Sequence, residues 1–126
     1  MLKDANIGVV LAVKDLARAR EFYGGKLGLD EETGNDPGGV FYKSGNGKFY
    51  VYESQFAGSN QATAATWQVD NIEYVVSELE SKGVTFEHYD DMPGVKRDGN
   101  LHVMDKLKAA WFKDPDGNIL NIVEGM

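Results

Sequence analysis

The chain of 126 residues has the length of one domain, and its hydrophobic content of 42% is sufficient for a core. Twenty acidic and thirteen basic residues give a net charge of −7, which argues against partners such as nucleic acid or anionic membrane and favours neutral or cationic ligands. The sequence contains no cysteine, which excludes disulfides and thiolate metal sites.

The N-terminal segment Met1 to Asn6 has neither a basic region nor an apolar stretch behind it, so we expect no signal peptide. No apolar run approaches the roughly 18 residues that a membrane span needs. We therefore expect a soluble, cytoplasmic protein, in keeping with the absence of cysteine.

The first elements are a strand and a helix. The β-branched run from Ile7 to Val13 predicts a strand. Asp15 follows it as a good N-cap, because its carboxylate can accept hydrogen bonds from the free N–H groups of the next turn. Apolar residues then recur at helical spacing until Gly24-Gly25 ends the predicted helix.

A hairpin comes next. Strands are predicted from Val40 to Lys43 and from Lys48 to Glu53. The Asn46-Gly47 pair between them favours a tight turn, because both residues tolerate positive φ. Residues 55–61 then form a connector.

The second half of the sequence again predicts a strand and a helix. The strand runs from Ala64 to Val69, and Asp70 with Glu73 resembles a capping box at the start of a helix that Gly83 ends. A short strand follows from Val84 to Glu87.

The last element is a second hairpin, with strands from Ala109 to Lys113 and from Ile119 to Glu124. In the turn between them, Pro115 presets φ and Gly117 supplies a positive φ.

These elements form a repeat. Residues 13–16 shifted by 56 coincide with residues 69–72, where an apolar run again ends before a helix start. Residues 41–50 shifted by 70 coincide with residues 111–120, so that an aromatic pair, a lysine and a turn glycine all match. The second copy must therefore carry about 14 extra residues before Trp111. The simpler alternative is that any two strand–turn–strand segments look alike.

Since a copy of about 60 residues is too small to fold alone, we expect one domain, residues 1–126. It comprises a first module of about 5–54, the connector 55–61 and a second module of about 62–126.

The motifs at both ends of the chain resemble those of a known family. Two motifs resemble those of the vicinal oxygen chelate superfamily, which comprises glyoxalases, bleomycin-resistance proteins and extradiol dioxygenases. The first consists of residues 13–16 followed by Phe22-Tyr23 and Leu27-Gly28-Leu29, and the second of residues 111–118 at the closing hairpin. The resemblance implies an α+β fold in which two tandem βαβββ modules form a cup-shaped mixed sheet. It also implies a homodimer.

Enzymes of that superfamily hold a divalent metal with His, Glu or Gln side chains at four strand positions. The resemblance and the two repeat shifts place these positions at Gly8, Val51, Ala64 and Asn121. Three of them have no donor atom in the side chain and the fourth has only a neutral amide, whereas transition metals prefer imidazole, thiolate or carboxylate. We therefore expect no metal and no other cofactor. A displaced metal site at His88 or His102 is the alternative.

Strand alternation predicts which side chains face the cup. The cup would be lined by residues that lie two positions from the four expected metal-ligand positions, and by aromatic residues of the preceding strands. These side chains would form apolar walls with a few polar groups, which is typical of a ligand site. A dimer interface or simple core packing is the alternative. The predicted ligand-binding residues on the strands are Phe41, Phe49, Glu53, Thr66, Gln68, Trp111 and Asn121.

The extra residues, 85–108, are too many for a tight connection and are expected to act as a lid. Tyr89, His102 and Met104 would then contact the ligand. The alternative is a solvated surface loop.

Catalytic residues cannot be assigned, because no nucleophile–base arrangement is recognisable. The leading hypothesis is a protein that binds a small aromatic or cationic molecule in a metal-free cup, as bleomycin-resistance proteins do. The alternative is a metal-dependent or metal-free lyase, isomerase or dioxygenase of the same superfamily. A third hypothesis is a structural or regulatory partner whose cup is filled by its own side chains.

Overall fold

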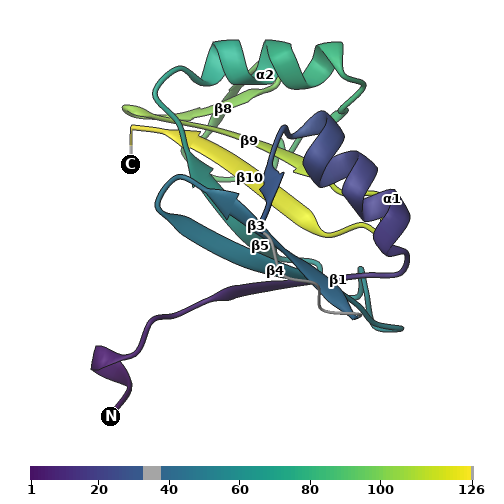
Figure 1. Cartoon of the computed structure of the whole chain (residues 1–126). Helices are drawn as coiled ribbons and strands as arrows, with labels where there is room; N and C mark the ends of the chain where they lie inside the picture. The colour runs from purple at the N-terminus through teal and green to yellow at the C-terminus, as the bar shows by residue number, and fades with distance from the viewer. Residues whose placement is uncertain (33–37, 126) are drawn as a thin grey trace. The chain divides into compact units, whose positions relative to one another are not determined.

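The computed structural model describes residues 1–32 and 38–125 (Figure 1). It has an α+β fold with two main helices and two mixed sheets, which confirms the predicted fold class. The chain divides into two compact units, Met1–Gly58 and Ser59–Met126, and the boundary lies within the predicted connector.

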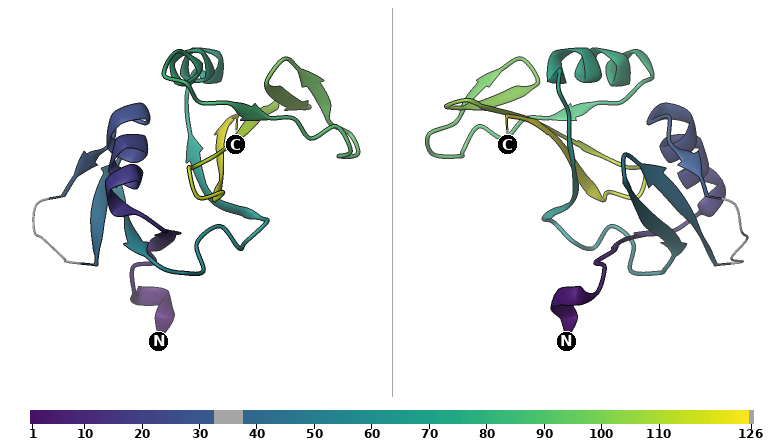
Figure 2. Two further views of the ribbon diagram at one scale, coloured as in Figure 1. Left: turned by 90° about the vertical axis from the view of Figure 1, so that its right-hand side faces the viewer. Right: turned by 60° about the vertical axis from the view of Figure 1, so that its left-hand side comes forward.

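The first unit carries one helix on one face of a four-stranded sheet (Figure 2). In chain order its elements are η1 (Leu2–Asp4), β1 (Val9–Val13), α1 (Leu16–Arg20), η2 (Glu21–Lys26), β2 (Asp30–Glu31), β3 (Gly39–Ser44) and β4 (Gly47–Glu53). The strand order is β1-β4-β3-β2, in which β1 and β4 are parallel and the other pairs are antiparallel.

The helix of this unit begins as predicted. The Asp15 side chain accepts hydrogen bonds from the backbone N–H groups of Ala17 and Arg18, and α1 continues directly into the π-helix η2. Below this helix lies an aromatic core, because alternate strand residues point toward it. The largest buried members are Leu11, Val13, Phe22, Tyr23, Tyr42, Phe49 and Val51.

The first hairpin turn differs from the prediction. Ser44 pairs with Gly47, so the two turn residues are Gly45 and Asn46, and Gly45 is the one with a positive φ of 55°. The Asn46-Gly47 pair is therefore not the centre of the turn, because Gly45 already supplies the left-handed conformation that a two-residue loop requires.

The second unit has the same arrangement with a larger sheet (Figure 2). Its elements are β5 (Thr63–Gln68), α2 (Ile72–Ser81), β6 (Phe86–Glu87), β7 (Lys96–Asp98), β8 (Leu101–Met104), β9 (Leu107–Lys113) and β10 (Ile119–Glu124). The strand order is β5-β10-β9-β8-β7, and β6 also pairs with β9.

The predicted capping box at Asp70 is wrong. Asn71 is the N-cap of α2, and its side-chain oxygen accepts a hydrogen bond from the N–H of Tyr74 at 3.2 Å. Asn and Asp are equally good caps, so composition alone could not place the helix start within one residue. At the other end of the helix, Gly83 has the predicted positive φ, of 90°.

Part of residues 85–108 belongs to the sheet, as β6, β7, β8 and the start of β9, whereas residues 88–95 form a loop between β6 and β7. The hairpin of β7 and β8 pairs with β9 through His102 opposite Ala109 and Met104 opposite Leu107. The outermost strand, β7, consists of Lys96, Arg97 and Asp98, which are all exposed. The extra residues of the second copy thus widen its sheet.

The repeat is visible in the strand pairing of the two units. Phe41 pairs with Tyr50 in the first unit, as Trp111 pairs with Asn121 in the second. The shift is 70 between β3 and β9 but 71 between β4 and β10, because the turn of the second hairpin is one residue longer. The predicted constant shift of 70 is therefore wrong after the turn.

Among the described residues, no helix is both long enough and apolar enough to cross a membrane.

Candidate functional site

The sheet of the first unit exposes the face that its helix does not cover. The strand pairing places Val10, Tyr50 and Phe41 in one row across this face, with Val10 opposite Tyr50 and Tyr50 opposite Phe41. Val10 is 58% exposed and Phe41 is 38% exposed, although both are large hydrophobic side chains. Exposed apolar side chains gathered on one face often mark a binding surface.

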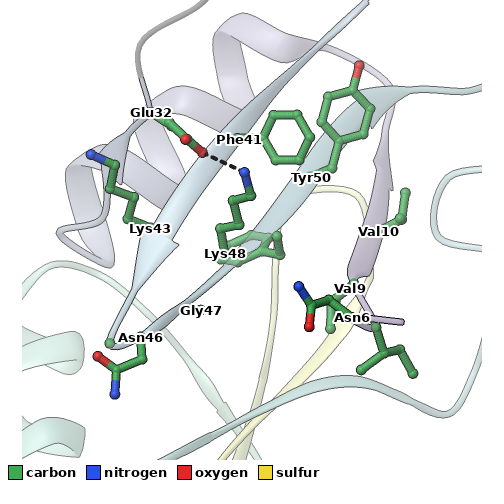
Figure 3. Close-up of a pocket in the computed structure, with 14 residues that line it drawn as sticks. Asn6, Val9, Val10, Glu32, Phe41, Lys43, Asn46, Gly47, Lys48 and Tyr50 are labelled. Atoms are coloured by element: carbon green, nitrogen blue, oxygen red, sulfur yellow. Dashed lines mark ion pairs between the residues drawn. The ribbon is translucent and has the colours of Figure 1, made fainter. Parts of the chain in front are cut away.

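A pocket of about 940 Å³ lies on this face (Figure 3). It is bounded by the segment that leads into β1, by the turn between β3 and β4, and by Glu32 after β2. The side chains that matter below are Val10, Glu32, Phe41, Lys43, Lys48 and Tyr50.

Two aromatic rings form the floor of the pocket. The centroids of Phe41 and Tyr50 are 4.7 Å apart with a tilt of 43°, and Tyr50 stacks on Tyr52 at 6.1 Å. Gly39 makes room for Tyr50, because a Cβ at this position would lie 2.4 Å from the tyrosine ring. Packing thus fixes the ring of Tyr50 on the exposed side of the sheet.

One cationic side chain reaches over this floor. The Lys48 ammonium lies 5.0 Å from the centroid of the Phe41 ring, within the range of a cation–π contact. It also forms an ion pair of 3.3 Å with a carboxylate oxygen of Glu32. Figure 3 shows this pair beside the Phe41 ring, with Tyr50 on the other side of that ring.

Two predicted ligand-binding residues of this unit direct their side chains to the opposite face, although Phe49 also borders the pocket. Phe49 is buried beneath the helix, where its ring centroid is 5.8 Å from those of Tyr23 and Tyr42. Glu53 uses its carboxylate to accept a hydrogen bond from the N–H of Leu16 at 3.2 Å. The shorter hairpin turn is the cause: the residue equivalent to Asn121 is Tyr50 rather than Val51, so the predicted face of β4 was inverted.

In the second unit the strand pairing brings three of the predicted residues into one row. Asn121 lies between Thr66 on one side and Trp111 on the other, the row equivalent to that of Val10, Tyr50 and Phe41. Alternation puts Gln68, His102 and Met104 on the same side.

Three of the predicted residues form an aromatic cluster in this unit. The rings of His102 and Trp111 meet edge to face at 4.9 Å, and Tyr89 lies 5.8 Å from His102 and 5.5 Å from Trp111. The indole N–H of Trp111 donates a hydrogen bond to Thr63 Oγ1 at 3.1 Å. Tyr89 belongs to the loop after β6, so the cluster joins this loop to the sheet.

The imidazole of His102 is almost completely buried, with 1% of its surface exposed. Its Nε2 accepts a hydrogen bond from the backbone N–H of Tyr89 at 2.9 Å, so the neutral ring carries its proton on Nδ1. Burial lowers the pKa of His102 below its ordinary value, while the Ala109 backbone opposes this shift. His102 thus accepts a hydrogen bond from the loop that carries Tyr89, while its buried Nδ1 has no hydrogen-bond partner among the described residues.

The side-chain amide of Asn121 is also used within the protein. It is buried, and its Nδ2 donates to the carbonyl oxygens of Ala110 at 3.0 Å and Ile122 at 3.3 Å. These bonds satisfy the amide N–H groups that would otherwise be buried without a partner.

The positions at which metal-binding relatives carry ligands do not fit a metal in this chain. With the corrected shift the second position is Tyr50, while Gly8 and Ala64 still contribute no side-chain donor and Asn121 only a neutral amide. Within residues 1–32 and 38–125, no group of three or more His, Cys, Asp or Glu side chains is arranged to hold a metal ion. His88 instead contacts Asn100 through its Nε2 at 2.8 Å.

Sequence reasoning missed Tyr50, Lys48 and Glu32 as residues of the exposed face. The signal was present in the unequal lengths of the two hairpin turns, which shift the repeat from 70 to 71. The contact between Glu32 and Lys48 has no sequence signal, because 15 residues separate the two.

Comparison with known proteins bears on the whole chain. The profile of the Glyoxalase/Bleomycin resistance protein/Dioxygenase superfamily matches residues 7–122. No curated protein matches the sequence.

Solved structures with a similar fold include a glyoxalase family protein from Enterococcus faecalis, with 21% identity and a TM-score of 0.73 over 98% of this chain and 100% of that one. A genomically encoded fosfomycin resistance protein from Listeria monocytogenes has 13% identity and a TM-score of 0.72 over 98% and 94% of the two chains. A lactoylglutathione lyase from Agrobacterium tumefaciens has 19% identity and a TM-score of 0.69 over 97% and 94%. At these identities the likeness establishes a shared fold.

Proposed function

Since the chain belongs to the Glyoxalase/Bleomycin resistance protein/Dioxygenase superfamily, we propose that it binds a small aromatic or cationic molecule without a metal, in the pocket of its first unit. The observation that carries this proposal is the aromatic floor of Phe41 and Tyr50. Both rings lie on the uncovered face of the sheet, where a flat ligand can stack on them.

The size and chemistry of the pocket support this function. About 940 Å³ is within the range of small-molecule sites, which are mostly apolar with a few polar groups. Here Val10 and the two rings supply the apolar surface, and Lys48 with Glu32 supplies the charged groups.

The test is a ligand-observed NMR screen of small aromatic compounds, followed by titration of Phe41→Ala and Tyr50→Ala. Each substitution should weaken binding about ten-fold, because an aromatic contact contributes roughly 0.5–1.5 kcal/mol beyond buried area. Tyr74→Ala is the matched control, since Tyr74 is 62% exposed on α2. A screen without ligands, or variants that bind as tightly as the wild type, would refute the proposal.

We propose the exposed face of the second unit as a separate ligand-binding surface of that unit. The predicted residues of this unit that are exposed or half-buried are Thr66, Gln68, Tyr89, Met104 and Trp111, whereas His102 and Asn121 are buried behind them. Trp111→Ala tests their involvement in the same titrations. Phe49 and Glu53 are left out, because they face the helix.

An enzymatic role as a lyase, isomerase or dioxygenase remains the alternative, in line with the lyase among the similar structures. Turnover that is abolished by chelation, or by loss of His88 or His102, would favour the enzyme. We also propose a homodimer, which light scattering of the purified protein tests directly.

A further inference from the structure

The ammonium group of Lys48 lies within the pocket of the first unit. Lys48 extends from β4 so that its ammonium lies over the Phe41 ring at 5.0 Å and beside the Glu32 carboxylate at 3.3 Å. An aromatic face and a carboxylate around one positive charge are the elements by which proteins recognise organic ammonium groups. The arrangement is therefore a cation site occupied by a side chain of the protein itself.

From this geometry we propose that the ligand of the pocket is an aromatic organic cation, and that Lys48 is an internal competitor which the ligand displaces. The inference rests on the proposed binding function. The ammonium of the ligand would take the place of the Lys48 ammonium near Glu32, and its ring would stack on Phe41 and Tyr50.

Displacing Lys48 costs little. The Lys48 side chain is 55% exposed, so its ammonium can move out into water. The Glu32 oxygen that it faces is buried without a hydrogen-bond partner, and the cation of a ligand would compensate it in place of the lysine. Exposed ion pairs contribute between about 0 and 1 kcal/mol, and a lysine that leaves the ring regains water and rotamer freedom. A ligand that brings its own cation together with a flat ring makes the same charge contacts and adds ring stacking.

Lys43 provides a matched comparison. It lines the same pocket, and Figure 3 shows its side chain directed away from the Phe41 ring. Removing either lysine changes the charge of the pocket equally, but only Lys48 occupies the cation site. A comparison of the Lys48 and Lys43 variants therefore separates competition at the cation site from a general effect of the pocket's charge.

The experiment is a calorimetric titration of the full chain with phenyltrimethylammonium, benzyl alcohol and benzoate, which are a cation, a neutral molecule and an anion. The wild type should bind the cation more tightly than benzoate. Lys48→Met and Lys48→Gln should each tighten binding of the cation by about two- to five-fold and change binding of benzyl alcohol less than two-fold. Lys43→Met should tighten binding of the cation less than either Lys48 variant does, and Glu32→Gln should weaken it several-fold.

Tighter binding of benzoate than of the cation by the wild type would overturn the inference, because Lys48 would then be an anchor for anions. Unchanged or weaker binding of the cation after Lys48→Met and Lys48→Gln would also overturn it. In either case, ring-dependent binding of benzyl alcohol would leave the proposed function intact. Failure of all three probes to bind would reject both this inference and the proposed binding function.

Discussion

Glu53 and Glu124 hold equivalent positions at the ends of β4 and β10, and each carboxylate accepts a hydrogen bond from the first backbone N–H of the helix in its own unit. The distances are 3.2 Å to the N–H of Leu16 and 2.9 Å to that of Ile72. The first N–H groups of a helix have no partner within the helix, and its positive end favours an anion. The contact therefore fastens each helix to the last strand of its sheet.

Glu124→Ala should lower the free energy of unfolding of the second unit by about 1–2 kcal/mol, since it leaves the N–H of Ile72 unpaired while Ile72 is fully buried. Glu124→Gln should lose less, because the amide oxygen still accepts. Urea denaturation and amide hydrogen exchange of Ile72 measure both effects. Glu80→Ala, an exposed change on the same helix, is the control. Unchanged stability and unchanged exchange at Ile72 would show that the contact contributes nothing.

Gly39→Ala should displace the ring of Tyr50. A Cβ at this position would lie 2.4 Å from the ring and 2.5 Å from the carbonyl oxygen of Val51, and the backbone cannot yield as a side chain can. We expect a loss of about 1–3 kcal/mol in stability from overpacking, with altered NMR shifts of the Tyr50 ring. Gly25→Ala serves as the control, because no atom lies within 4 Å of its added Cβ. Tyr50 shifts that stay at their wild-type values would contradict this packing.

Stability should fall on acidification because of His102. Burial lowers the pKa of this histidine from its ordinary value of 6.5, so the unfolded chain binds the proton more readily than the folded one. The stabilising contribution is thus present above pH 6.5 and is lost as the pH falls through the lower folded value. The nearby Arg97 and His88 act in the same direction as burial, whereas Asp90 opposes them.

The measurement is chemical denaturation across this pH range for the wild type, His102→Gln and His88→Gln. In His102→Gln the side-chain oxygen can still accept a hydrogen bond from the N–H of Tyr89, but the side chain does not titrate. The stability of this variant should therefore depend less on pH than that of the wild type. His88→Gln should change the profile less than His102→Gln does, because burial is the largest cause of the lowered His102 pKa and His88 only adds to it. Identical profiles for all three proteins would exclude His102 as the origin.

The protein purified without chelators should contain no stoichiometric divalent metal. Gly8 and Ala64 supply no side-chain donor at two of the four positions where metal-binding relatives carry ligands. Elemental analysis by mass spectrometry measures the metal content per chain. One Zn, Fe, Mn or Ni per chain would contradict the prediction and favour the enzymatic alternative.

The sequence predicted the fold class and most elements, because each strand and helix has a local pattern and the pattern occurs twice. It failed where distant residues decide the outcome. The face of Phe49 depends on the length of one turn, and a shift of one residue inverts a whole strand. The cation site could not be predicted either, since only the folded sheet brings Lys48 over Phe41.

The hairpin that widens the second sheet also determines how that sheet ends. Without β7 the outer edge would be β8, whose Leu101 and Val103 could pair with another chain. With β7 the edge is three residues long and consists of Lys96, Arg97 and Asp98, all exposed. A short, charged edge is a poor template for strand addition, so the insertion protects this end of the sheet against aggregation.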